Sequence, residues 1–204
     1  MKWRSGTSAF LTLLALVMGA RAIAHEPTTD GCGSVSSDDA LELEVMRSPA
    51  IPITAGSNAG ENLPELTLDK RYAISLVAQD QMRFAVKPRR ASRTASQRGG
   101  ALHFEVPAAG RYRISITSRH WIDVVDGRTI LESVDHHGPG CDLVHKIVEF
   151  DLPGGRPLTL QISGQDDAII GLAITVSPDA AHRNDLEARS KPAGHASAVP
   201  AGGR

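Results

Sequence analysis

Apolar side chains recur at every second position between residues 41 and 176, and turn-forming residues interrupt this pattern at short intervals. A spacing of two is typical of β-strands that bury one face, whereas amphipathic helices repeat every three to four positions. The stretch "GRYRISITS", residues 110–118, shows the pattern well. Its apolar side chains are predicted to face a core and its polar side chains to face water, the two sets being Tyr112, Ile114 and Ile116, and Arg111, Arg113 and Ser115.

The same pattern predicts about nine or ten short strands in roughly 135 residues, and no clear helix. The predicted strands span residues 41–46, 72–77, 82–86, 101–107, 110–118, 121–125, 129–134, 144–153, 158–164 and 169–176. Many short strands without an internal repeat or a linker are typical of one domain with two packed sheets. The sequence therefore predicts an all-β fold, a two-sheet antiparallel sandwich of the jelly-roll or immunoglobulin-like kind, over residues 41–177.

Turn residues refine this outline at two places. The dipeptide Asp126-Gly127 lies between two strand-like runs, and it predicts a tight hairpin turn with positive φ at both central positions. The segment 87–100 is basic and polar and ends in two glycines, so we expect a mobile loop there.

Residues 1–24 have the organisation of a secretory signal peptide: a basic start, an apolar run over residues 9–20 and small residues at the end. The apolar run is well short of the roughly twenty residues that span a bilayer. We expect cleavage after Ala24, with Ala22 as the alternative, and no transmembrane anchor in the mature chain. The mature protein is thus expected in the periplasm or outside the cell.

The C-terminal end and the net charge of the mature chain limit the kinds of partner that it is expected to bind. Residues 178–204 consist mainly of Ala, Gly, Pro, Ser and charged residues, which predicts a disordered tail. The whole chain has 22 basic and 23 acidic residues, and loss of the predicted signal peptide removes basic residues only. The resulting negative charge argues against nucleic acid as a partner.

Cys32 and Cys141 are the only cysteines. A single pair in an exported protein predicts a disulfide, which would close a loop of about 110 residues. Because bridged Cα atoms lie within about 7 Å of each other, the bridge would hold the N-terminal segment 25–40 beside the loop that contains Cys141. His25, the expected mature N-terminus, would then lie near that loop.

That loop, "DHHGPGCDLVHK", is rich in potential metal ligands. His136, His137 and His145, with His25 brought near by the disulfide, would form an imidazole-rich site that suits copper best and zinc as the alternative. The spacing matches no established zinc motif, and an oxidised Cys141 cannot be a thiolate ligand. The other interpretation is a solvent-exposed turn without function. The sequence leaves both open.

Trp121 is the only tryptophan outside the predicted signal peptide. An exposed indole could bind a sugar or another flat ligand, as in a carbohydrate-binding module, whereas a buried one would only pack in the core or at a sheet edge. For catalysis the signals are weaker, because no G-x-S-x-G nucleophile motif is present.

The run "HWIDVVDGRTILESVDHHGPGCDLVHKIVEFDLPGGRPLTLQISG", residues 120–164, preceded by "GRYRIS", resembles a group of small exported proteobacterial proteins. These proteins generally lack an assigned activity, and some carry the name homogentisate 1,2-dioxygenase. That name implies a cupin-type enzyme with ferrous iron on two histidines and a glutamate, for which His136, His137 and Glu132 would be the candidates.

The sequence therefore predicts an exported, disulfide-bonded β-sandwich with a non-catalytic role. Its ligand would be a small molecule, a metal ion or a protein of the cell envelope. The alternatives are an enzyme, either the dioxygenase or a hydrolase, and a carbohydrate-binding module.

Overall fold

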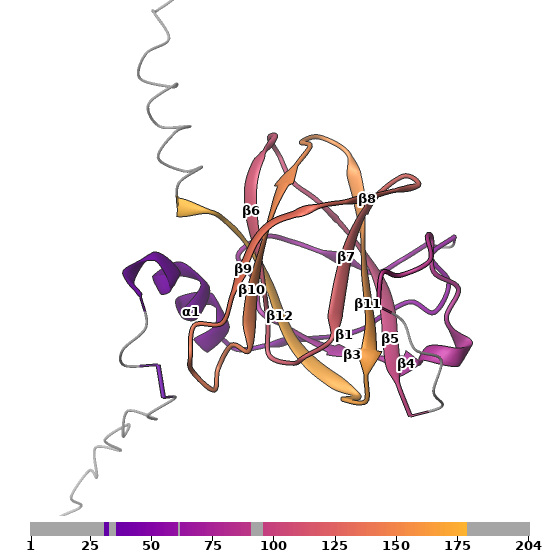
Figure 1. Ribbon diagram of the computed structural model, residues 1–204, viewed down its shortest axis with the longest axis horizontal. Coiled ribbons are helices and arrows are strands. Elements are labelled where there is room, and N and C mark those ends of the chain that lie inside the picture. The colour runs from indigo at the N-terminus through magenta and orange to yellow at the C-terminus, as the bar shows by residue number, and fades with distance from the viewer. Residues whose placement is uncertain (1–30, 33–35, 61, 91–95, 179–204) are drawn as a thin grey trace, which may run out of the picture.

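A computed structural model describes residues 31–32, 36–60, 62–90 and 96–178, and it confirms an all-β sandwich of two sheets (Figure 1). The first, sheet A, has six strands in the order β1 (Ile51–Thr54), β3 (Tyr72–Ser75), β12 (Ile169–Val176), β6 (Gly110–Ile116), β10 (Lys146–Leu152) and β9 (Ser133–His137). The second, sheet B, has the order β2 (Glu65–Leu66), β5 (Arg98–Glu105), β11 (Pro157–Gln165), β7 (Trp121–Asp126) and β8 (Thr129–Leu131), with β4 (Val77–Ala78) also paired to β5.

Most neighbouring strands are antiparallel, but each sheet also has one parallel pair at an edge. These pairs are β1 with β3 in sheet A and β2 with β5 in sheet B. Whether an edge strand pairs in parallel depends on how segments that are distant in the chain meet, and the alternating pattern of a strand does not encode this. Both sheets are therefore mixed, not purely antiparallel.

The main hydrophobic core lies between the two sheets, and the alternating pattern correctly predicts which residues fill it. In β5, β6 and β11 every second side chain points inward and is almost fully buried. The inward residues of these strands are Leu102, Phe104, Tyr112, Ile114, Ile116, Leu158, Leu160 and Ile162.

The segment predicted as a strand at 41–46 is instead helix α1 (Ala40–Arg47), which follows the short 3-10 helix η1 (Ser37–Asp39). Ser36 caps this start, since its hydroxyl accepts a hydrogen bond from the backbone N–H of Asp38 at 3.2 Å. Acidic residues in the first turn also favour a helix start, because they interact well with its positive end. This capping signal outweighs the short run of alternating leucines.

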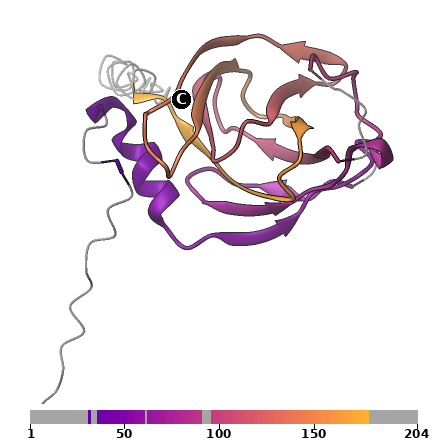
Figure 2. The ribbon, with the colours of Figure 1, turned by 60° about the horizontal axis from the view of Figure 1, so that its bottom comes forward.

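Helix α1 packs on the outer face of sheet A, beside β12 (Figure 2). A second hydrophobic cluster forms there, in which Leu43 and Met46 of the helix contact Ile147 and Ala173 of the sheet. The prediction that the polar face of residues 110–118 is solvent-exposed was therefore wrong. Arg113 is only 8% exposed and Ser115 is fully buried, because α1 covers them.

The disulfide between Cys32 and Cys141 is present, with Cα atoms 4.8 Å apart, and it joins this second cluster. It connects the segment before α1 to the loop between β9 and β10, as predicted. A disulfide is consistent with an oxidising compartment.

The outer face of sheet B is crossed by residues 86–90, a segment that we call the strap. Residues 82–86 were predicted as a strand, but only Arg83 forms a β-bridge, to Asn58. Side chains of sheet B hold the backbone of the strap. The amide of Gln161 accepts from the N–H of Val86 at 3.2 Å and donates to the carbonyl of Val86 at 3.1 Å. Ser163 Oγ donates to the carbonyl of Arg90 at 3.1 Å. Polar side chains here replace the pairing that a strand would make.

The predicted mobile loop 87–100 ends earlier than expected, because β5 already begins at Arg98. Gly100 is buried inside this strand, and a Cβ at this position would lie 2.3 Å from the Cβ of Ala55. Its glycine therefore serves close packing, not flexibility.

The predicted hairpin between β7 and β8 is present, but its two-residue turn is Gly127-Arg128. Gly127 has φ +58°, and Arg128 has no positive φ, as in a type II′ turn. The predicted strand 129–134 is two strands, β8 in sheet B and β9 in sheet A, so the chain changes sheets at Glu132.

The predicted signal peptide (1–24), His25 and nearly all of the predicted tail (178–204) lie outside the described residues. Within the described part of the chain, no helix has the length and apolar character needed to cross a membrane.

Candidate functional site

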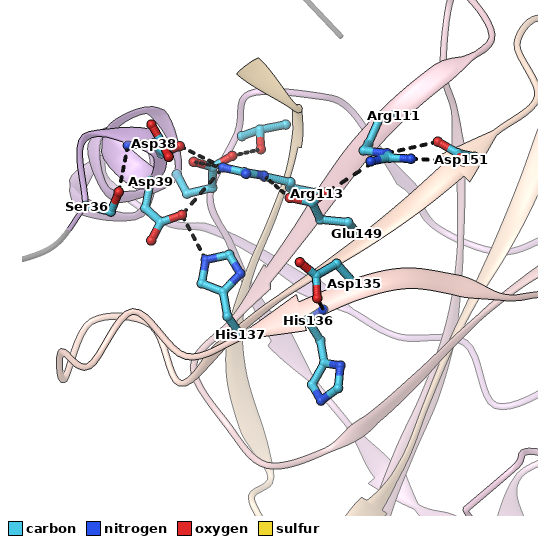
Figure 3. Close-up of polar contacts among 12 residues, drawn as sticks. Ser36, Asp38, Asp39, Arg111, Arg113, Asp135, His136, His137, Glu149 and Asp151 are labelled. Carbon is cyan, nitrogen blue, oxygen red and sulfur yellow. Dashed lines mark hydrogen bonds and ion pairs between the residues drawn. The ribbon is translucent and has the colours of Figure 1, made fainter. Parts of the chain in front are cut away.

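The two adjacent histidines of the predicted metal site point to opposite sides of sheet A (Figure 3). In β9, His136 is paired with Val148 and His137 with Ile147 of β10. Neighbouring residues of a strand alternate between faces, so His136 shares the inner face with Val148 and His137 shares the outer face with Ile147. The two imidazoles cannot bind one ion in this arrangement.

His137 belongs to a buried charge cluster beneath α1. Its Nε2 lies 2.9 Å from Oδ1 of Asp39, at the start of the helix. Arg113 lies at the centre of the cluster: its Nε donates to Glu149 at 2.7 Å, and its NH1 lies 3.6 Å from Glu42. These contacts attach α1 to sheet A and give His137 a structural partner.

Of the other candidate ligands, the described residues His145 and Glu132 form no metal-binding group with either histidine. His145 is largely exposed. Partial burial of its ring lowers its pKa, and the positive charges of Arg119 and Lys146 lower it further. Glu132, the third candidate for an iron site, forms a two-pronged ion pair with Arg89. Among the described residues no group of three His, Cys, Asp or Glu side chains is placed to hold a metal ion.

The structure instead forms a pocket beside Trp121, at the edge where β7 and β8 of sheet B approach β9 and β10 of sheet A. The pocket is partly open to solvent, and the space it holds has a volume of about 120 Å³. Its apolar walls are Trp121, Ile122, Leu131, Val148 and Phe150. A space of this size suits a compact group of about the size of benzene. Mainly apolar walls with a few polar groups are typical of ligand pockets.

Polar groups lie at the rim of this pocket, which we call the apolar pocket. They include Ser133 and His136 from β9, Lys146 from β10 and Arg89 from the strap. The Nζ of Lys146 donates to the carbonyl of His120 at 2.6 Å, and burial, together with the charge of Arg90, lowers its pKa. His136, predicted as a metal ligand, is thus a rim residue of this pocket.

Asp123 holds one wall of the apolar pocket in place. Its Oδ1 accepts from Nε1–H of Trp121 at 2.9 Å, and its Oδ2 accepts from the backbone N–H of Arg89 at 3.1 Å. The side chain is 2% exposed, so both hydrogen bonds are shielded from water. Asp123 therefore fixes the indole and the strap relative to each other before any ligand binds.

Trp121 also contacts two cations. The guanidinium of Arg90 lies over the indole at 4.9 Å from the ring centre, and Nζ of Lys146 lies at 5.9 Å. Both distances are within the range of cation–π attraction. The half-buried indole is thus neither a bare sugar platform nor an ordinary core residue.

A serine, a histidine and an aspartate also meet at the end of β6, but they are not arranged for hydrolysis. Ser118 Oγ lies 2.9 Å and Asp167 Oδ2 3.9 Å from the same nitrogen of His120, Nδ1. A catalytic histidine uses one ring nitrogen for the serine and the other for the carboxylate. His120 is fully buried, and burial lowers its pKa despite the opposing charge of Asp167.

Sequence reasoning identified Trp121 as a ligand candidate, but it missed Arg89, Asp123 and Lys146. In the sequence, Asp123 and Lys146 look like ordinary polar positions of alternating strands. The one available signal was the basic pair Arg89-Arg90 in the predicted loop.

No protein-family model matches this chain, and comparisons with curated proteins and with solved structures give no match.

Proposed function

We propose that this protein is an exported, non-catalytic binding protein that holds a small molecule in the apolar pocket beside Trp121. The observation that carries this proposal is the fixed pocket wall: Asp123 binds both the indole of Trp121 and the strap. A binding site that is formed before the ligand arrives loses less entropy on binding. The ligand would place a compact apolar group between Ile122, Leu131 and Phe150.

Export is part of the proposal, and three features support it. They are the signal-like residues 1–24, the resemblance of residues 120–164 to small exported proteins, and the disulfide Cys32–Cys141. Mass spectrometry of protein extracted from the cell envelope should find a chain that begins at His25 and contains the oxidised cysteine pair. A full-length chain that stays with the cytoplasmic fraction would contradict export.

Ligand binding can be tested with a neutral apolar probe, cyclohexanecarboxamide, because it has no absorbance that overlaps tryptophan. We expect it to change the fluorescence of Trp121 in protein that begins at His25, and to be detected independently by ligand-observed NMR. The substitution Ser133→Phe places a ring at the pocket rim and should weaken binding at least about tenfold.

The matched control is Val134→Phe, at the next residue of β9. Val134 is 44% exposed and does not line the pocket, so this variant should bind like the wild type. Equal binding by the wild type and the Ser133→Phe variant would place the ligand elsewhere. If the probe changes neither signal, the proposed pocket function is wrong.

A further inference from the structure

A second pocket adjoins the apolar pocket and differs from it in charge. Its volume is about 400 Å³, and it shares Trp121 and Arg89 with the apolar pocket. Arg90, Arg119 and Gln97 also line it. We call it the arginine pocket. The indole of Trp121 is thus a wall common to an apolar space and a basic one.

The side chains that line the two pockets are unbalanced in charge, and a further carboxylate, Asp166, lines an adjoining hollow that shares Gln97 with the arginine pocket. The linings of the two pockets contain the basic side chains of Arg89, Arg90, Arg119 and Lys146, and one carboxylate, Asp123. That carboxylate already accepts from Trp121 and the backbone of Arg89, while the side chain of Arg89 is paired with Glu132. The whole chain has a formal charge of −1, so this excess of positive charge is local. A basic recess on such a protein attracts anions.

Arg90 is well placed to bind an oxyanion. Its guanidinium lies over the indole at 4.9 Å, and its carbonyl is fixed to sheet B by Ser163. A guanidinium held in this way still has N–H groups that can donate in parallel to two oxygens of one carboxylate or phosphate. Arg119, which also lines the arginine pocket, is exposed and can supply a second cation.

The neighbouring apolar pocket restricts what carries this anion. Ile122, Leu131 and Phe150 offer no hydrogen-bond partners, so the hydroxyl groups of a sugar ring that face these walls would lose their water without replacement. A compact hydrocarbon group has no such cost, and its burial is favourable. The two pockets together fit an amphipathic molecule better than an acidic sugar.

We propose that the ligand is a small amphipathic oxyanion, a carboxylate or phosphate on a compact apolar group, whose charged end binds Arg90 and Arg119 while its apolar end fills the apolar pocket. This inference rests on the proposed function, because it names the class of ligand for the same site. It adds a second recognition element, the arginine pocket, to the first.

The test compares molecules of nearly equal shape that differ in charge. Cyclohexanecarboxylate and cyclohexanecarboxamide are titrated into protein that begins at His25, in a phosphate-free buffer, and binding is followed by ligand-observed NMR and Trp121 fluorescence. We expect the acid to bind at least about tenfold more tightly than the amide, since hydrogen bonds to charged groups are the stronger kind. Cyclohexyl phosphate distinguishes the two oxyanion sources: preference for it over the carboxylate assigns phosphate, and the reverse assigns carboxylate.

Two variants test which residues cause the preference for the acid over the amide. Arg90→Gln and Arg119→Gln should each reduce the affinity for the acid about fivefold or more and leave the affinity for the amide nearly unchanged. Arg128→Gln, in the exposed turn between β7 and β8, is the matched control and should leave both unchanged. Higher salt should weaken binding of the acid only.

The outcomes separate this inference from the proposed function. If acid and amide bind equally well, the arginine pocket does not select an anion, although the apolar pocket still binds its ligand. Tighter binding of galacturonate than of cyclohexanecarboxylate would overturn the amphipathic assignment in favour of an acidic sugar. If neither cyclohexane compound binds, both the proposed function and this inference are wrong.

Discussion

The carboxylate of Asp123 accepts a hydrogen bond from the indole N–H of Trp121 at 2.9 Å, two residues away on the same face of β7. It also accepts from the backbone of Arg89, so Asp123→Ala would leave two partly buried N–H groups without an acceptor. We expect a loss of about 1–3 kcal/mol in the free energy of unfolding and a more mobile indole. Denaturant titration and the fluorescence anisotropy of Trp121 measure these effects.

The control for Asp123 lies on the same strand. Asp126 pairs with Arg156, whose side chain is 54% exposed, so Asp126→Ala should cost less than about 1 kcal/mol and leave the anisotropy unchanged. Equal anisotropy in wild type and Asp123→Ala would show that packing alone holds the indole.

Arg113 is the buried cation that connects α1 to sheet A. Arg113→Met removes the nearer of the two cations beside Glu149, the other being Arg111 at 4.0 Å, and it leaves the buried Glu42 without a counter-charge, which should cost about 3–5 kcal/mol of stability. Denaturant unfolding measures the loss. Arg156→Gln, at an exposed ion pair, should change stability by less than about 1 kcal/mol.

If Arg113→Met does not fold, Glu149→Gln provides the second measurement. It keeps the shape of the side chain and one acceptor for Arg113, so its effect should be smaller but still larger than that of Arg156→Gln. Similar stability of all three variants would mean that the cluster does not hold the helix in place.

The disulfide closes a loop with a sequence separation of 109 residues. Its loss should destabilise the protein by roughly 2–4 kcal/mol, because the unfolded chain gains conformational freedom. The measurement compares denaturant unfolding of the oxidised wild type with a Cys32→Ser/Cys141→Ser variant. Addition of a reductant should move the wild type towards the variant and leave the variant unchanged. Coincident unfolding curves without reductant would contradict the expected contribution.

His120 should make the protein less stable in mild acid. Burial lowers its pKa in the folded state; Asp167 and Asp166 oppose this effect, while Lys146 adds to it. Above the ordinary histidine value of 6.5 the ring is neutral in both states, and its contribution to stability is fully present. As the pH falls below that value the unfolded chain takes up the proton more readily, so stability is lost towards the lowered pKa of the folded state.

The measurement is the free energy of unfolding at about pH 7.5 and about pH 5.5. His120→Gln should be less stable than wild type at the higher pH but lose less on acidification. His145→Gln, at an exposed histidine whose pKa is also lowered, should alter the pH dependence less. An identical loss on acidification in wild type and His120→Gln would assign it to other groups.

The sandwich was predictable from sequence because its core depends on a local property, the alternation of side chains such as Ile114 and Ile116. The covering of the outer face of sheet A by α1 was not predictable from the sequence. The polar side chain of Arg113 looks solvent-exposed in the sequence, and only the position of α1, far away along the chain, makes it buried. The missed local signal was the cap of η1, which leads into that helix: Ser36 accepts from the backbone N–H of Asp38.

In the candidate site, too, some features were predictable from the sequence and others depend on how the chain folds. The disulfide was predictable because two cysteines leave one pairing, and Trp121 stood out by its rarity. His136 and His137 are adjacent in sequence, yet strand geometry places their side chains on opposite faces, so proximity along the chain does not bring the two imidazoles together. Arg89 and Lys146 line the same pocket as Trp121 only because of the relative placement of the strap and the two sheets, which the sequence pattern does not specify.

Glu132 is the single residue between the end of β8 in one sheet and the start of β9 in the other. Leu131 and Ser133, on either side of it, both line the apolar pocket. Two peptide units span at most about 7 Å, so the covalent backbone limits how far the sheets can spread at this point. The backbone therefore sets a maximum width for the apolar pocket at this edge. Inserting glycines after Glu132 should allow bulkier ligands to bind without replacing any lining residue.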